Sequence, residues 1–271
     1  MKKLLAIALL VLLASLAFGQ AKTTPTTQTP AQAQAPTGSH LPQAKTPEEF
    51  KAYQDALAKH DAPGAEAAAN DFATEYPNSE LRAALYQQAM TMYDGVGNSP
   101  KALEMARKTL QLEPENVVAL VVAASNLAEH TRESDLDKDD RLNEAATDAN
   151  KALGLVDDMI VPSTLTPEQA KTVRGTLRSW AWTSLGIGQY IRKDYAAAEA
   201  SFLKAVDFGK ANPEALLFLR LTLAQDQLGK YSQALQNIDT VLKLAPAGSQ
   251  LAQLAGNEKD RLTKLSNAPP K

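Results

Sequence analysis

Five carboxylates in one short segment have the spacing most suggestive of chemistry in this sequence. They recur at positions 1, 3, 5, 7 and 12 of a run, as the ligands of a calcium-binding loop do: Glu133, Asp135, Asp137, Asp139 and Glu144. Lys138 stands where such a loop needs a glycine, and Asp140 stands where an apolar residue belongs. We therefore predict that residues 131–144 form a solvated acidic loop that favours the start of the next helix, and that they hold no metal.

Other reactive residue types are scarce or isolated. The three histidines, His40, His60 and His130, have no partners at metal-ligand spacing, and the chain has no cysteine to supply a thiol nucleophile. No serine lies in a nucleophile-elbow pattern. A phosphate loop could be read into Gly186-Ile187-Gly188, but these residues lie within a strong helical pattern. The sequence therefore predicts a protein without catalytic residues or a cofactor.

The elements that carry these residues repeat along the chain with a period of 36 residues. The positions that return are Trp182, Leu185, Gly186, Tyr195, Ala198, Phe202 and Ala205, answered by Phe218, Leu221, Thr222, Tyr231, Ala234, Ile238 and Val241. Within each unit the large residues fall on two helical faces separated by a short turn, and the small residues allow the two helices to approach closely. Such a unit is a helical hairpin, and a fixed period of this length is typical of a stacked repeat protein.

The repeat resembles the tetratricopeptide repeat, whose pattern is matched best over residues 179–246. Gln189 and Gln225 depart from this pattern, because the family has an aromatic residue there. The resemblance implies an all-α solenoid of about five antiparallel hairpins wound into a right-handed superhelix. It also implies that the concave face, formed by the first helix of each hairpin, binds a peptide or a helix of a partner protein.

Weaker copies of the pattern extend the repeat domain to residues 46–266. We expect two earlier hairpins over residues 46–77 and 83–114 and an interrupted middle hairpin with helices over 117–129 and 141–155. A terminal capping helix is expected over 249–265. Helix starts are marked by candidate capping boxes at Thr46 and Thr166, and by polar residues before proline at Ser99-Pro100 and Asn212-Pro213. Pro167 precedes the repeat residue Trp182 by several helical turns. The helix that begins at Pro167 should therefore be longer than the first helix of an ordinary hairpin.

The candidate binding residues are those that the repeat register places on the concave face: Trp180, Thr183, Ile187, Tyr190, Leu216, Leu219 and Asp226. Aromatic side chains are effective anchors at protein interfaces. Two alternatives stay open for Trp180, which is either exposed on this face or covered by the loop of residues 156–165. The second alternative follows from the apolar stripe that Val173, Leu177 and Trp180 form on the extended helix.

The first residues of the chain have the pattern of an export signal. Lys2-Lys3 precede an apolar stretch from Leu4 to Leu16 and a small-residue cleavage site at Ala17-Phe18-Gly19. We expect residues 1–19 to be removed near Gly19/Gln20, which places the protein in a bacterial periplasm or outside the cell without a transmembrane segment in the mature chain. Residues 20–45 are rich in Thr, Pro, Gln and Ala, as disordered linkers are, and residues 267–271 are expected to form a disordered tail.

Net charge restricts the partner. The whole chain has a formal charge of −3, which becomes −5 when the two leading lysines are removed. An acidic chain is disfavoured as a partner of nucleic acid or an anionic membrane. We therefore predict a non-catalytic scaffold or adaptor of the bacterial cell envelope with a protein partner. The alternative is a periplasmic protein that binds a small molecule or glycan in a pocket near the interrupted hairpin. The oligomeric state and the identity of the partner do not follow from these residues.

Overall fold

The fold was established from a computed structural model that describes residues 42–267. Over this range the regular elements are all helices. Their bounds are α2 Pro47–Leu57, α3 Ala62–Glu75, α4 Arg82–Gly95, α5 Ser99–Leu112, α6 Val117–Glu129, α7 Lys138–Leu155, α8 Pro167–Ile191, α9 Tyr195–Phe208, α10 Ala215–Gln227, α11 Tyr231–Leu244 and α12 Gln250–Ser266. The predicted signal peptide and most of the predicted linker lie outside the described residues.

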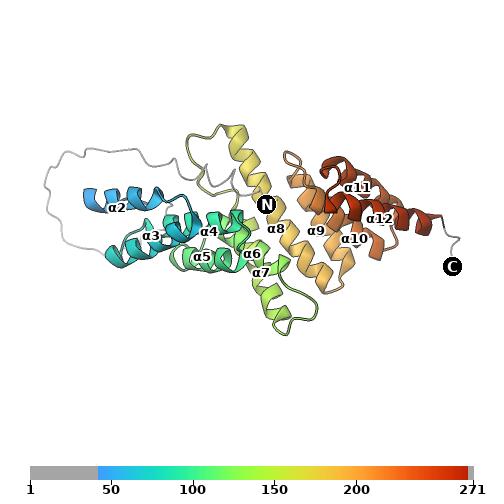
Figure 1. The fold of residues 1–271 in the computed structure, drawn as a ribbon, viewed down its shortest axis with the longest axis horizontal. Coiled ribbons are helices and arrows are strands. Elements are labelled where there is room, and N and C mark those ends of the chain that lie inside the picture. Colours follow the sequence, from blue (N-terminus) through green and yellow to red (C-terminus); the bar gives the residue numbers. More distant parts are fainter. Residues whose placement is uncertain (1–41, 268–271) are drawn as a thin grey trace.

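The helices stack in chain order as hairpins, from α2 at one end of an elongated molecule to α12 at the other (Figure 1). Each hairpin pairs an even-numbered helix with the next odd-numbered one, and α12 packs on α11. The described residues thus contain five hairpins and a terminal helix. The all-α solenoid expected from the repeat is confirmed.

The interrupted middle hairpin has the predicted first helix, since α6 spans Val117–Glu129. Its second helix, α7, begins three residues before the expected Arg141, at Lys138. The extension of α8 is also confirmed, because this helix runs for 25 residues from Pro167. Two arginines on α8 hold the preceding loop: the guanidinium of Arg174 donates to Met159 O at 3.0 Å, and Arg178 forms an ion pair with Asp157.

Helix starts follow the sequence signals only in part. Thr166 and Gln169 form a complete capping box, with each side chain bonded to the backbone N–H of the other residue. Thr46 caps α2, but Glu49 reaches back to the N–H of Lys45 instead of that of Thr46. This carboxylate therefore does not complete the predicted box.

Two predicted starts were wrong in register. The cap of α5 is Asn98, whose side chain accepts from Lys101 N, so that Ser99 and Pro100 lie inside the helix. Asn212-Pro213 does not cap α10, which begins at Ala215 after an N-cap residue, Glu214, that has no side-chain cap. Polar residues before a proline thus marked each helix only to within a few residues.

Close packing explains why the repeat alternates large and small residues. A Cβ atom at Gly186 would lie 2.5 Å from Cε1 of Phe202, so only glycine leaves room for this ring between α8 and α9. In the next hairpin the same two positions hold Thr222 and Ile238, both fully buried. A larger residue on one helix is therefore matched by a smaller one on the other.

Candidate partner-binding face

The first helices α4, α6, α8 and α10 form one side of the solenoid, which we call the first-helix face. It carries the residues predicted to bind a partner. Trp180 is half-buried on α8, and its indole N–H donates to Oε1 of Glu214, at the start of α10, over 3.0 Å. The indole is therefore oriented toward the next hairpin, although its ring also packs against the main core, to which Met159 of the loop contributes.

The other three candidates on α8 are placed differently from one another. Thr183 is buried, and its hydroxyl donates to the backbone of Ser179 within the same helix. Ile187 is half-buried and packs against two clusters, one that includes Leu127 of α6 and one that includes Leu221 of α10. The side chain of Ile187 therefore occupies the space between α6 and α10.

Tyr190 lies near the last turn of α8. Its ring meets that of Tyr195 edge to face, with 5.2 Å between the ring centroids. Burial raises the pKa of Tyr190, and the negative charges of Asp226 and Glu258 act in the same direction. Tyr190 also packs against the apolar cluster that includes Leu217 and Leu221 of α10.

The three candidates on α10 differ in their exposure and in their partners. Leu216 is 38% exposed, which makes it the most accessible large apolar residue of α10. Leu219 instead packs toward α11 and α12, beside Ile238 and Leu251. Asp226 is ion-paired at 2.5 Å with Arg261 of α12, so its charge is already matched within the chain. Glu214 joins the Trp180 indole to the start of α10, where Leu216 is exposed.

Several residues on this face were missed at the sequence level. Glu214 was not recognised as the partner of Trp180, and Glu129 of α6 pairs with Arg220 of α10 over 3.1 Å. The 36-residue period relates neighbouring hairpins only, and Glu129 and Arg220 are 91 positions apart. No local signal could have paired them.

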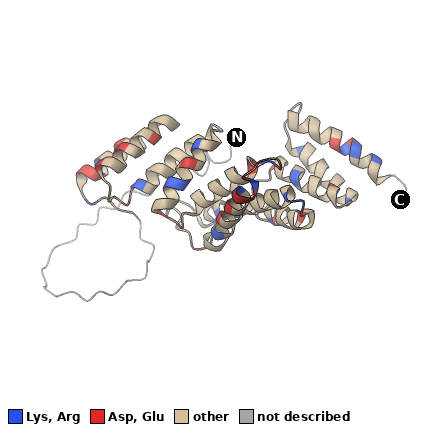
Figure 2. Ribbon diagram, turned by 90° about the horizontal axis from the view of Figure 1, so that it is seen from below, with Lys and Arg blue, Asp and Glu red and all other residues tan. Residues whose placement is uncertain are grey.

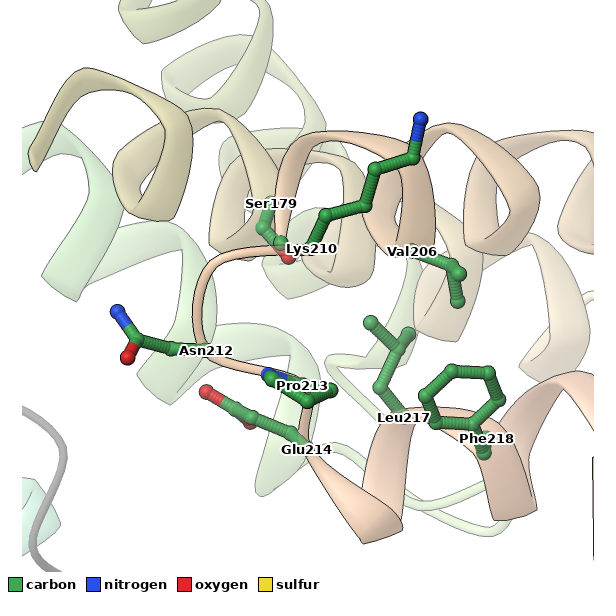
Figure 3. Close-up of a pocket in the computed structure, with 9 residues that line it drawn as sticks. Ser179, Val206, Lys210, Asn212, Pro213, Glu214, Leu217 and Phe218 are labelled. Carbon is green, nitrogen blue, oxygen red and sulfur yellow. The ribbon is translucent and has the colours of Figure 1, made fainter. Parts of the chain in front are cut away.

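Two pockets stand out among the described residues. One has a volume of about 170 Å³ and lies between α8, the end of α9 and the start of α10. Figure 3 shows Val206, Leu217 and Phe218 facing one another in this pocket. The second, at the junction of α6, α7 and α8, has no room for a water molecule. Sites for drug-sized ligands span roughly 300–1,000 Å³. The pocket expected under the interrupted hairpin is therefore not seen.

The predicted acidic loop of residues 131–144 is a loop only in its first half, because α7 begins at Lys138 and contains Asp139 and Glu144. Its acidic residues pair with different parts of the chain. Glu133 pairs with Lys193 at 2.5 Å, and Glu144 pairs with Arg107 at 2.8 Å. Asp135 accepts from the N–H of Arg132. Over residues 42–267, no three His, Asp or Glu side chains are grouped as metal ligands would be.

Charges of both signs are interspersed along the helices from one end of the solenoid to the other (Figure 2). Between residues 42 and 267 no helix combines the length and the apolar character that crossing a bilayer requires.

No family model matches this chain, and no curated protein matches it. Its fold is similar to that of a thermophilic TPR protein of Thermus thermophilus, with 15% identity over 78% of this chain and 98% of the other, and a TM-score of 0.47. It is also similar to MamA, with 17% identity over 68% of this chain and 87% of the other, and a TM-score of 0.41. A third similar structure is that of PilW, a widely conserved type IV pilus biogenesis factor, with 17% identity over 77% of this chain and 98% of the other, and a TM-score of 0.40. The assignment of the fold rests on the helices of this chain.

Proposed function

We propose that this tetratricopeptide-like solenoid is a non-catalytic adaptor that binds a peptide or helix of another protein on its first-helix face. The observation that carries the proposal is a half-buried Trp180 whose indole N–H is held by Glu214, two positions before the exposed Leu216 at the start of α10. Tryptophan in a fixed orientation can bury a large apolar area at little cost in side-chain entropy. A neighbouring leucine extends the apolar surface along α10.

The stacking of hairpins supports this function physically. Each hairpin packs on its neighbours, so the first helices are held as one continuous and pre-formed surface. A pre-formed surface loses little conformational entropy when a partner docks. Small-molecule binding has less support, because the pocket between α8, α9 and α10 has a volume of only about 170 Å³.

We further propose that the adaptor acts in the bacterial cell envelope, in the periplasm or after secretion. This step depends on the sequence of residues 1–19, which has the charged, apolar and small-residue segments of a signal peptide. Fractionation of cells that express the full chain with a C-terminal tag, followed by mass determination of the exported form, tests it. Export with loss of about twenty residues is expected from the length of such signals; a full-length protein retained in the cytoplasm would contradict it.

Two matched variants test the binding face. Leu216→Glu places a charge on the first-helix face, whereas Leu203→Glu places the same charge on α9, where Leu203 is 49% exposed. After chemical crosslinking in the native envelope and purification of the tagged full chain, we expect Leu216→Glu to lose a partner that Leu203→Glu retains. Equal recovery with both variants, at unchanged helical content, would reject this face as the binding surface.

A further inference from the structure

The Glu129–Arg220 pair links two helices that are not neighbours in the stack. Glu129 is the last residue of α6, Arg220 lies in the middle of α10, and α8 packs between these two helices. Packed helices lie 8–10 Å apart, which would place α6 and α10 about 16–20 Å from each other in a straight stack. Their side chains nevertheless approach to 3.1 Å. An extended arginine and an extended glutamate side chain cover this separation, so the pair bridges α6 and α10 across α8.

Apolar packing around Ile187 also connects α8 with clusters on both of its sides. Ile187 of α8 contacts the cluster of Leu127 and Ala128 as well as the cluster of Leu221 and Ala224. Both Arg220 and Glu129 are partly accessible, with side-chain exposures of 20% and 40%. The pair thus lies at the edge of solvent, where it can break without opening the core.

We propose that the Glu129–Arg220 pair is a clasp that holds the solenoid curved around α8 and sets the width of its first-helix face. Breaking the pair frees the α10–α11 hairpin and α12 to move away from α6, and the first-helix face becomes wider. A partner that docks on α8 lies beside the closed clasp or opens it. The clasp is a property of the free chain and does not depend on the proposed partner.

The absence of cysteine in the sequence allows a direct test with two introduced labels. Gln111 on α5 and Gln236 on α11 are exposed and lie on the two sides of the clasp, so both are replaced by Cys and spin-labelled. Pulsed electron spin resonance then gives the distribution of distances between the labels. We expect one narrow distribution for the parent chain, and a longer and broader one for Arg220→Ala and for Glu129→Gln.

Two controls separate the clasp from a general loss of charge. The reversed pair, Glu129→Arg with Arg220→Glu, should restore the parent distribution. Arg107→Ala removes an ion pair between α5 and α7, which belong to consecutive hairpins, and should leave the distribution unchanged. Raising the salt concentration should broaden the distribution of the parent but not that of Arg220→Ala, since salt screens partly exposed pairs. Distributions for Arg220→Ala and Glu129→Gln that superimpose on that of the parent would overturn the proposal.

Discussion

Gln189 accepts a 2.7 Å hydrogen bond from the hydroxyl of Ser201, and this bond joins the two helices of one hairpin, α8 and α9. Thirty-six residues later, Gln225 accepts a 2.8 Å bond from Asn237 between α10 and α11. These glutamines stand where the tetratricopeptide pattern has an aromatic residue. The departure from the family pattern therefore occurs in both hairpins. In each one, a side-chain hydrogen bond between the two helices replaces the packing of an aromatic ring.

Replacing Gln225 tests how much these hydrogen bonds contribute to the free energy of unfolding. Gln225 is buried and also donates to Oε1 of the buried Glu199 at 3.2 Å. Gln225→Ala leaves both partners without this amide, and a buried polar group that loses its partner costs about 1–3 kcal/mol. We expect urea unfolding to show a loss of about 2–3 kcal/mol, following the same estimate. Gln189→Ala, at a half-buried position with one such bond, should lose less; equal losses would contradict the network.

The contact of Gly186 with Phe202 predicts a coupled pair of substitutions. Gly186→Ala alone forces the new methyl group against the ring, and overpacking of this kind costs about 1–3 kcal/mol. In a Phe202→Ile background the same change should cost less by about 1 kcal/mol or more, because the shorter side chain leaves room. Unfolding of the four chains of this double-mutant cycle measures the coupling. Strictly additive free energies would show that the close approach is not what requires glycine.

Lys193 occupies a backbone conformation that the equivalent turns give to glycine. Its φ is 65°, and Gly97 and Gly229, in the corresponding turns of other hairpins, have φ of 74° and 70°. A side chain in this left-handed region costs about 1–2 kcal/mol. Lys193→Gly should therefore stabilise the chain by about 0.5–1 kcal/mol, because the pair with Glu133 that it removes is exposed and screened by solvent. Thermal unfolding measures this gain; a lower midpoint than that of the parent chain would contradict it.

Asp148 on α7 makes the stability depend on pH. Burial, followed by the charge of Glu144 one turn away, raises the pKa of Asp148 to about 6 from 3.8. The folded chain therefore holds this proton more tightly than the unfolded chain, and its contribution to stability falls as pH rises from about 4 to 6. Asp148→Asn should remove that slope and, since the group is only partly buried, gain about 1 kcal/mol at pH 7. Parallel stability curves of the two chains between pH 4 and pH 8 would contradict the assignment.

The fold was largely predictable because its determinants are local. The period of 36 residues places each apolar residue on a helix face, and the bounds of α6 and the start of α8 agree with the structure. Errors occurred where tertiary contacts decide the register. Examples are the cap at Asn98 and the start of α10 at Ala215, two positions later than Asn212-Pro213 suggested.

The candidate site was less predictable than the fold. The register placed Trp180 and Leu216 among the candidates, but it did not show that Asp226 pairs with Arg261, or that the Thr183 hydroxyl donates within its own helix. A residue's place in the repeat gives its face, whereas its partners depend on how the hairpins curve relative to one another. The pair of Glu129 with Arg220 depends on that curvature most directly.

Site-specific photocrosslinking tests the proposed adaptor function most directly. A photoreactive amino acid is placed at Leu216 in one full-length chain and at Leu203 of α9 in another, and both are irradiated in the native envelope. We predict a discrete adduct with another protein from position 216, absent from position 203 and lost when Trp180→Ala is added. The same adducts from both positions, or none from position 216, would contradict the assignment of partner binding to the first-helix face.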